Sequence, residues 1–208
     1  MIDVRPDGFV VLGRERAKPL APDERRSAIV DAVIPLLRER GRGVSTREIA
    51  EACGVAEGTI FRAFGDKDSL IAAAVERYFD PEPLRNALRG IDPDDPVEEK
   101  VRQVLHLLRE RFTGVVAFMS ALGMQGGPPP HVRPATDREW LTTVALIFRD
   151  DELNVSTDDL GHYLRLIAFG SSLPPITASH TFTTDELVAL ALRGILPRAT
   201  TTSPRKKN

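Results

Sequence analysis

Residues 44–70 constrain the fold of this 208-residue chain more than any other stretch. Ser45 is followed three residues later by Glu48, which is the capping-box pattern of a helix start: the hydroxyl accepts from one backbone N–H and the carboxylate from another. Apolar residues recur at helical spacing as far as Cys53, and Gly54 then provides a residue that adopts a left-handed conformation at little cost. The pattern predicts a short helix that begins after Ser45 and ends at Cys53 or Gly54.

A second short helix is expected over residues 57–64, where Ile60 and Phe64 form one apolar stripe. Two helices that cross steeply over a turn of about three or four residues need a small residue where they touch, a flexible residue in the turn and a branched apolar residue in the second helix. Ala50, Gly54 and Ile60 meet these needs in that order. Such a helix-turn-helix unit presents its second helix to the major groove of DNA while its first helix crosses the backbone.

With the helix before it and the start of the helix after it, this stretch resembles the DNA-binding domain of TetR-type transcriptional regulators. The resemblance extends from near residue 22 to near residue 78, and its motifs are the capped helix at 45–50, Gly54-Val55, Gly58-Thr59-Ile60-Phe61-x-x-Phe64 and Lys67-x-x-Leu70. It implies an all-α homodimer. In such a dimer an N-terminal three-helix helix-turn-helix domain reads a palindromic double-stranded DNA operator, and a larger C-terminal helical domain dimerises and usually binds a small-molecule effector.

The chain is expected to divide into four segments: a flexible N-terminal arm at 1–21, the helix-turn-helix DNA-binding domain at 22–80, the helical effector-binding and dimerisation domain at 81–198, and a disordered basic tail at 199–208. The DNA-binding domain should open with a helix over 22–40. Pro35 is expected to kink this helix, because a proline inside a helix removes one backbone hydrogen bond. Three cations of the arm either reach the DNA or belong to a solvated tail: Arg14, Arg16 and Lys18.

The residues assigned to the DNA-binding surface are Arg42, Thr46, Arg47, Glu57, Thr59, Phe61, Arg62 and Lys67. Phosphate contacts position a protein on DNA, and base contacts specify the sequence. Thr46, Arg47 and Lys67 are expected at phosphates. Thr59 and Arg62 are expected at phosphates or base edges, since arginine suits guanine. The alternative for the two arginines is that they are solvated surface charges.

The second helix of this unit departs from the family pattern. Family members commonly carry a tyrosine whose hydroxyl meets a phosphate where this chain has Phe61, and often histidine or tyrosine where it has Ala63. Phe61 is therefore expected to pack rather than to read DNA, and Ala56 replaces the usual hydroxyl-bearing cap. Glu57 either accepts a hydrogen bond from a cytosine amino group or repels the phosphates.

The C-terminal domain is expected to be helical throughout. After a short helix at 84–89, Pro96 opens an amphipathic helix that extends to Phe112. The apolar residues 113–124 form either a central buried helix or the wall of a cavity. The remaining expected elements are a Gly-Pro loop at 126–130, a helix at 133–148, a helix capped by Thr157-Asp158-Asp159 that ends before Pro174, a linker, and a helix capped by Thr184-Asp185-Glu186 that ends at Pro197.

In the resembling family the effector pocket lies among the middle helices. The candidates that this implies are His106, Arg109, Phe112, Phe118, Met119, Met124, Trp140, Thr143, Phe148 and Tyr163. Pockets are mostly apolar with a few polar groups, so an apolar or aromatic molecule would fit. The alternative is that aromatic and methionine residues at helical spacing simply form the core.

The last two helices fit the pair through which members of this family dimerise, which would build a four-helix interface. The interface candidates are Leu164, Ile167, Gly170, Leu187, Leu190 and Ala191. The alternative is that both helices complete the core of the monomer.

Composition narrows the class of function. A net charge of −2 disfavours a non-specific nucleic-acid binder, whereas a sequence-specific regulator needs a basic surface only where it faces DNA. Cys53 is the single cysteine, which excludes an intrachain disulfide and a zinc cluster of several cysteines, and fits a reducing cytoplasm. The chain has no apolar run of the length of a membrane span and no signal-peptide pattern at its start.

Catalysis is not expected. The four histidines show no metal-ligand spacing: His106, His131, His162 and His180. Ser120 lacks the Gly-x-Ser-x-Gly surroundings of a nucleophile, and the chain has no glycine-rich phosphate loop. We therefore expect no catalytic residue, no metal and no cofactor.

Three functions stay open on the sequence. The favoured one is a dimeric repressor that leaves its operator when a small, largely apolar effector stabilises a conformation whose recognition helices no longer match successive major grooves. The second is a DNA-binding regulator without a small-molecule ligand. The third is a helical binding or scaffold protein with weakened or lost DNA binding, a reading that Phe61 and Glu57 support.

Overall fold

The computed structural model describes residues 21–124 and 137–195, and every regular element in these ranges is a helix. In chain order the elements are α1 Pro22–Arg40, the 3-10 helix η1 Gly41–Gly43, α2 Thr46–Cys53, α3 Glu57–Phe64, α4 Lys67–Phe79, α5 Glu82–Arg89, α6 Val97–Ala121, α7 Asp137–Ile147, α8 Thr157–Gly170, α9 Pro174–Thr177 and α10 Thr184–Ile195. The predicted all-α class is confirmed. The predicted arm, apart from residue 21, the Gly-Pro loop and the basic tail lie outside the described residues.

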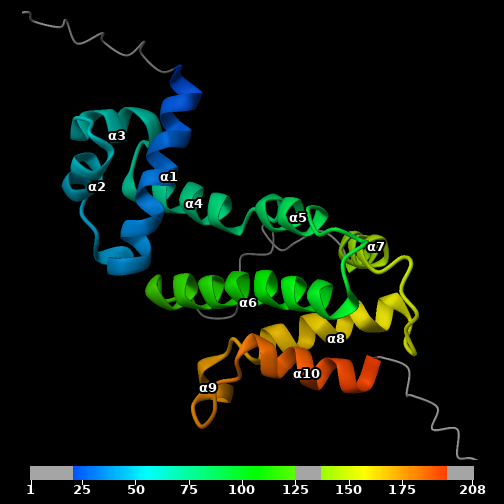
Figure 1. Ribbon diagram of the computed structural model, residues 1–208. Helices are drawn as coiled ribbons and strands as arrows, with labels where there is room; N and C mark the ends of the chain where they lie inside the picture. The colour runs from blue at the N-terminus through cyan, green and yellow to red at the C-terminus, as the bar shows by residue number, and fades with distance from the viewer. Residues whose placement is uncertain (1–20, 125–136, 196–208) are drawn as a thin grey trace, which may run out of the picture.

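Helices α1 to α4 gather at one end of the molecule, and α4 leads from there toward α5 (Figure 1). The core of this unit is made of side chains that are at most 2% exposed: Ile29, Val33, Leu37, Ile49, Ile60, Leu70 and Ile71. The predicted bounds of α1 and α3 and the predicted end of α2 are confirmed. Helix α1 includes Pro35 in its interior without a break in the helix.

Helix α6 is a single helix of 25 residues that contributes to two cores. Its first half packs against α8 and α10 through Val101, Leu105 and Leu108, while Phe118 near its end joins the core of α1 to α4. Residues 113–121 therefore continue the helix that precedes them. Within this stretch Phe118 is buried and the other side chains are partly or fully exposed, so the expected buried central helix is wrong for most of it. Helix α6 continues through Gly114. This residue lies against Tyr78 of α4, and a Cβ at position 114 would be 2.7 Å from the tyrosine hydroxyl.

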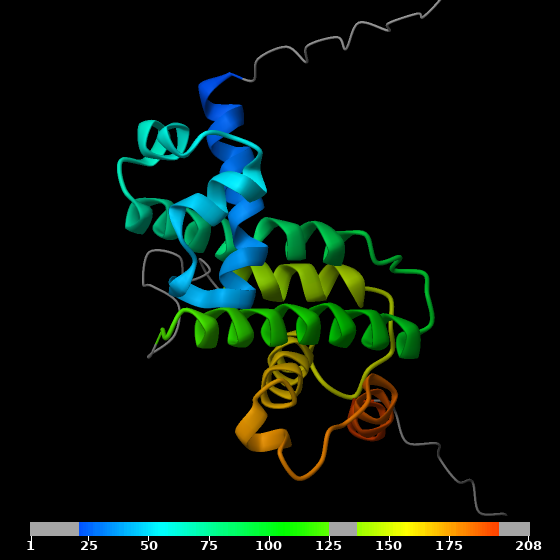
Figure 2. The same ribbon diagram turned by 90° about the vertical axis from the view of Figure 1, so that its left-hand side faces the viewer.

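The second core surrounds the first half of α6 and includes side chains from α5, α7, α8 and α10. Helices α8 and α10 run beneath α6, and α4 and α5 lie above it, in both views (Figures 1 and 2). Its most buried side chains come from α6, α7, α8, α10 and the residue after α7: Val104, Leu105, Val144, Phe148, Leu160, Leu164, Val188 and Ala191. Lys100, which is 1% exposed, is satisfied inside this core by Asp151 Oδ2 at 2.6 Å and the Pro93 carbonyl at 2.8 Å.

The C-terminal helices differ in detail from the expectation. Ser156 and Thr183, rather than the residues after them, cap α8 and α10, since each hydroxyl accepts from the backbone N–H three residues later. Helix α8 ends at Gly170, and the expected linker includes the short helix α9. Within the described ranges, no helix combines the length and the apolar character that a membrane span requires.

Candidate nucleic-acid interface

The start of α2 is held by the predicted capping box. Ser45 Oγ accepts from the backbone N of Glu48 at 3.2 Å, and Glu48 Oε2 accepts from the backbone N of Ser45 at 2.8 Å. The hydrogen bonds from Ser45 lower the pKa of Glu48. The amides of Thr46 and Arg47, the first two residues of α2, have no acceptor within the helix. An exposed helix end of this kind suits an anion such as a DNA phosphate.

The turn between α2 and α3 has the predicted geometry. Gly54 is left-handed at φ 64° and ψ 30°, and its N–H donates back to the carbonyls of Ala50 and Glu51. Val55 N then donates to the Ala50 carbonyl at 3.0 Å, which closes the turn and returns the chain to the core. The residue at position 54 must therefore be one that adopts positive φ without strain.

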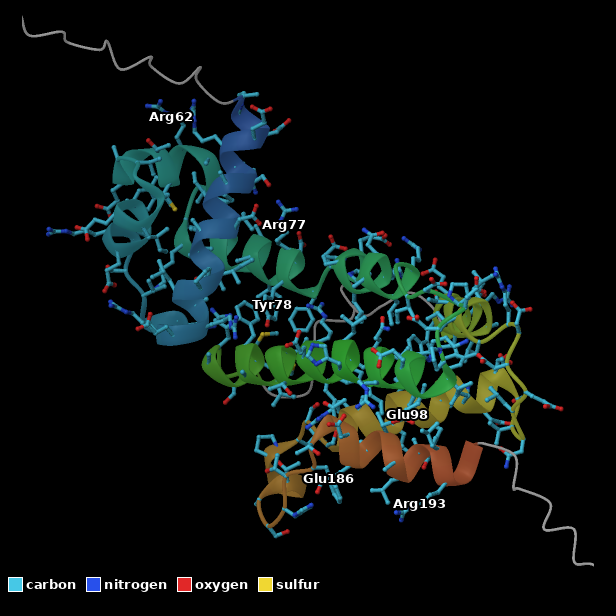
Figure 3. All side chains as sticks on the ribbon, in the orientation of Figure 1. Arg62, Arg77, Tyr78, Glu98, Glu186 and Arg193 are labelled. Atoms are coloured by element: carbon cyan, nitrogen blue, oxygen red, sulfur yellow. The ribbon has the colours of Figure 1, made fainter. Side chains whose placement is uncertain are left out.

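Helix α3 buries one side and exposes the other. Ile60 and Phe64 are 1% and 7% exposed, while Glu57, Phe61 and Arg62 are exposed. Arg62 projects away from the helix bundle (Figure 3). Phe61 is 47% exposed, next to the buried Ile60 in the sequence, so it lies on the surface side of α3 and is not part of the core. Thr59 is half-buried.

Most of the polar groups assigned to phosphates have a partner within the chain. Arg47 Nε lies 2.9 Å from Glu51 Oε1, and this carboxylate is the main reason that the pKa of Arg47 is raised. Lys67 Nζ donates to the Arg42 carbonyl at 2.7 Å, which ties the start of α4 to η1. The Arg47–Glu51 pair is largely exposed, and exposed ion pairs contribute little in water. Arg47 is therefore able to exchange its partner for a DNA phosphate.

Two further polar contacts fall on the same surface. The hydroxyl of Thr46 donates to the carboxylate of Glu57 across the turn. Arg42 Nη1 lies 3.3 Å from Asp68 Oδ1, with both side chains largely exposed. These side chains thus form separate local contacts: Thr46 with Glu57 at the starts of α2 and α3, and Arg42 with Lys67 and Asp68 at the start of α4.

Helix α3 is held in place by a residue that the sequence did not single out. Arg26 of α1 donates to the carbonyl of Ala63 near the end of α3, and its guanidinium carbon lies 4.2 Å from the centre of the Phe64 ring. Helix α4 is fixed to α1 in a similar way, because Arg77 pairs with Asp31 at 2.9 Å (Figure 3). Neither contact has a local signal in the sequence, since each joins helices far apart along the chain.

Comparison with known proteins decides the family. Residues 29–74 match the family model for bacterial regulatory proteins of the tetR family. The HTH-type transcriptional repressor KstR of Mycolicibacterium smegmatis is 30% identical over 168 residues, which span 76% of this chain and 78% of that protein. The chain belongs to the TetR family. The region that matches the family model includes α2 and α3, the helix-turn-helix pair.

Two further comparisons agree in part. An uncharacterized HTH-type transcriptional regulator of Mycobacterium tuberculosis is 31% identical over 98 residues, which span 47% of this chain but only 42% of that protein. A tetR-family transcriptional regulator from Streptomyces coelicolor has a similar fold, with a TM-score of 0.56 at 19% identity over 83% of this chain and 79% of that chain. That structure supports the fold alone.

The predicted ligand-binding residues of this TetR-family regulator do not gather in one place. Phe118, Met119 and Met124 belong to the core of α1 to α4, whereas Phe112, Trp140 and Phe148 belong to the second core. Phe118 and Phe148 are 0% and 1% exposed, which favours the alternative that they form the core.

The polar candidates for ligand binding either form hydrogen bonds within the protein or are exposed at its surface. Arg109 donates to Thr184 Oγ1 at 2.9 Å and to the Phe182 carbonyl at 2.8 Å, so it holds the start of α10 on α6. Thr143 Oγ1 donates to the Glu139 carbonyl of its own helix at 2.9 Å. His106 and Tyr163 are exposed. Of the ten candidates, Phe112 and Trp140 combine partial burial with a place in the second core.

The predicted dimer residues divide in the same way. Leu164, Leu187 and Ala191 are at most 5% exposed and pack in the second core, which favours the alternative that they complete the core of the subunit. Ile167 and Gly170 are partly exposed and Leu190 is 44% exposed. Three apolar residues of α8 that the sequence analysis did not select for the interface are exposed on the TetR-family subunit: Tyr163, Leu166 and Phe169.

Proposed function

We propose that this TetR-family regulator is a dimeric repressor that binds a palindromic DNA operator through α2 and α3 and leaves it when a small, largely apolar effector binds. The observation that carries the proposal is the exposed side of α3 beside the capped start of α2. Arg62 is available there for base edges, and the first amides of α2 are available for a phosphate.

Dimerisation is proposed through α8 and α10. Tyr163, Leu166, Phe169 and Leu190 are 37%, 69%, 46% and 44% exposed, although they are large and apolar. An exposed apolar patch on a soluble subunit marks a binding surface, and a second copy of the same chain would bury it symmetrically. A dimer would also place two copies of α3 at a fixed spacing, which reading a palindrome requires.

Repression rather than activation is supported by the relative from Mycolicibacterium smegmatis, which is named as a repressor. Effector control needs a route from the C-terminal helices to α3. Helix α6 supplies one, because it belongs to both cores and contacts the end of α4 through Phe118, which stacks on Tyr78 with ring centroids 4.1 Å apart. An effector that binds one arrangement of α6 more tightly than another would shift α4, and with it α3.

The experiment is selection of DNA from a random-sequence pool by the purified protein at moderate salt, followed by sequencing. The proposal expects an enriched palindrome whose half-sites lie about one helical turn apart or a multiple of it. If no sequence is enriched and binding stays weak and sensitive to salt, the alternative of a helical scaffold protein with lost DNA binding replaces it. The internal pairing of Thr46, Arg47 and Lys67 is the observation that favours that alternative.

A small-molecule effector is tested separately. Apolar and aromatic compounds are screened for a rise in melting temperature, since a ligand that binds only the folded state stabilises it by mass action. Hits are then tested for release of the selected operator. Hits that stabilise the protein without releasing DNA would leave a DNA-binding regulator that no small molecule switches.

A further inference from the structure

Glu57 joins the starts of two helices. It is the first residue of α3, and its carboxylate accepts a hydrogen bond from the hydroxyl of Thr46, the first residue of α2. The N-terminal end of a helix carries partial positive charge and stabilises an anion close to it. One carboxylate therefore lies against the positive ends of both helices of the helix-turn-helix.

The same carboxylate also acts on a cation of this surface, Arg47. The pKa of Arg47 is raised first by its hydrogen bond to Glu51 and by the charge of Glu51, and to a lesser extent by the charge of Glu57. Glu57 thus lies within electrostatic reach of Thr46 and Arg47. These two residues also provide the amides of the first turn of α2 that have no acceptor within the helix.

A DNA phosphate at the start of α2 needs the groups that Glu57 already occupies. The phosphate would accept from the Thr46 hydroxyl and from the first amides of α2, and Arg47 would supply positive charge. A phosphate at this position would be repelled by the adjacent Glu57 carboxylate, because both are negatively charged. DNA binding must therefore either break the Thr46–Glu57 hydrogen bond or bring the phosphate close to the Glu57 carboxylate. In both cases the loss of binding free energy comes from the DNA backbone and is the same for every sequence.

We infer that the Glu57 carboxylate competes with a DNA phosphate for the Thr46 hydroxyl and the first amides of α2. This competition lowers the affinity of the regulator for every duplex and does not contribute to sequence specificity. The inference rests on the proposed function, because it assumes that α2 and α3 face DNA. It decides between the two roles that the sequence left open for Glu57. A carboxylate that reads a cytosine amino group would instead strengthen binding to the operator alone.

The test compares wild type with Glu57→Gln and Glu57→Ala on two duplexes: the operator recovered by selection and an unrelated sequence of the same length. Both variants should bind both duplexes more tightly by the same factor, about tenfold at moderate salt. The salt dependence should steepen by about one unit of slope for one additional phosphate contact. The ratio between the two affinities should stay as in wild type.

Two controls separate the inference from simpler effects. Glu152→Gln removes the same charge from an exposed residue between α7 and α8, and should leave both affinities within about twofold of wild type, because exposed charges farther apart than a screening length of about 10 Å interact little. Thr46→Val in the Glu57→Gln background removes the hydroxyl that the change frees, and should reverse part of the gain. Circular dichroism and melting temperature establish that each variant is folded.

Three outcomes would overturn the inference. Weaker binding of Glu57→Gln to the operator alone would make Glu57 a base reader. Weaker or unchanged binding to both duplexes would mean that the carboxylate positions Thr46 or does nothing on DNA. If neither wild type nor any variant binds DNA, the proposed function fails together with the inference, whereas binding by wild type without a gain in the variants refutes the inference alone.

Discussion

The guanidinium of Arg111 in α6 donates a hydrogen bond to the backbone carbonyl of Tyr78 in α4 at 2.7 Å. A second bond reaches the carbonyl of Asp80 at 3.3 Å. The last carbonyls of a helix have no donor within that helix, and the negative end of its dipole favours a cation. Burial lowers the pKa of Arg111, and electrostatic interactions with Tyr78 and Asp80 offset part of this decrease. Arg111 thus caps α4, the helix that follows the helix-turn-helix, from the C-terminal core.

Arg111→Ala should destabilise the protein. The change leaves partly buried carbonyls without a donor, and a lost hydrogen bond of this kind costs about 1–3 kcal/mol in the free energy of unfolding. Chemical denaturation measures the loss, and amide exchange at the last turn of α4 should become faster. The matched control is Arg149→Ala, which removes an exposed pair with Asp150 and should leave the free energy of unfolding nearly unchanged. If the two changes lower the free energy of unfolding equally, Arg111 does not stabilise the end of α4 as a cap.

Gly114→Ala should also be destabilising, although alanine ordinarily favours a helix over glycine by about 1 kcal/mol. The added Cβ would lie 2.7 Å from the Tyr78 hydroxyl, and the tyrosine ring cannot move freely because it is stacked on Phe118. Overpacking of this kind costs about 1–3 kcal/mol.

The partner change identifies the cause. Adding Tyr78→Phe to Gly114→Ala removes the crowded hydroxyl and should recover most of the lost stability in thermal unfolding. Gly58→Ala in α3, where a Cβ would meet nothing within 4 Å, is the control and should be neutral or stabilising. A Gly114→Ala protein as stable as that control would contradict the close contact between α4 and α6.

The local elements of this fold could be predicted because their signals lie within a few residues of one another. Ser45 with Glu48 identified the start of α2, and Gly54 identified its end, since capping and positive φ depend on neighbours alone. Ser156 and Thr183 were missed as caps because adjacent residues are equally good candidates by type. Contacts such as Arg111 with Tyr78 join residues far apart in the sequence, and no local pattern marks them.

The surface of α8 shows a second limit. Leu160, Leu164 and Ala168 form the buried stripe, and Tyr163 and Leu166 lie on the exposed side, but both sides are apolar in sequence. Periodicity alone does not decide which stripe faces the core of the same chain. For this reason the sequence analysis selected Leu164, which lies on the buried stripe, as an interface candidate.

The exposed stripe gives a prediction on assembly. Leu166→Glu should convert dimers to monomers in analytical ultracentrifugation without loss of helix, because Leu166 is 69% exposed and the charge would be buried only between subunits. Leu146→Glu in α7 is the matched control, since Leu146 is 60% exposed on another helix. If Leu166→Glu remains dimeric while Leu146→Glu dissociates, the interface lies on α7.

Acid should weaken the capped start of α2. The pKa of Glu48 lies below its ordinary value of 4.5, mainly because the backbone and the hydroxyl of Ser45 donate to it. A group whose pKa is lowered by folding adds stability that is fully present above its unfolded-state pKa and is lost as the pH falls through the lower folded-state pKa. Glu48→Gln should therefore melt below wild type at neutral pH.

The pH dependence of that difference is the diagnostic measurement. The gap in melting temperature between wild type and Glu48→Gln should shrink once the pH falls below 4.5. Ser45→Ala removes one donor to the carboxylate and also the cap of the Glu48 amide, so its gap at neutral pH should shrink only in part as the pH falls. A gap that is independent of pH would show that the charge of Glu48 does not stabilise the start of α2.

The measurement that tests the central claim most directly is the affinity of Arg62→Ala for the selected operator and for single-base variants of it. If α3 reads the major groove, the change should cost about 1–3 kcal/mol of binding free energy and abolish discrimination at one base pair of each half-site. Arg38→Ala, an exposed cation near the end of α1, is the control for lost charge. Unchanged affinity and unchanged discrimination in Arg62→Ala would contradict a DNA-reading role for α3.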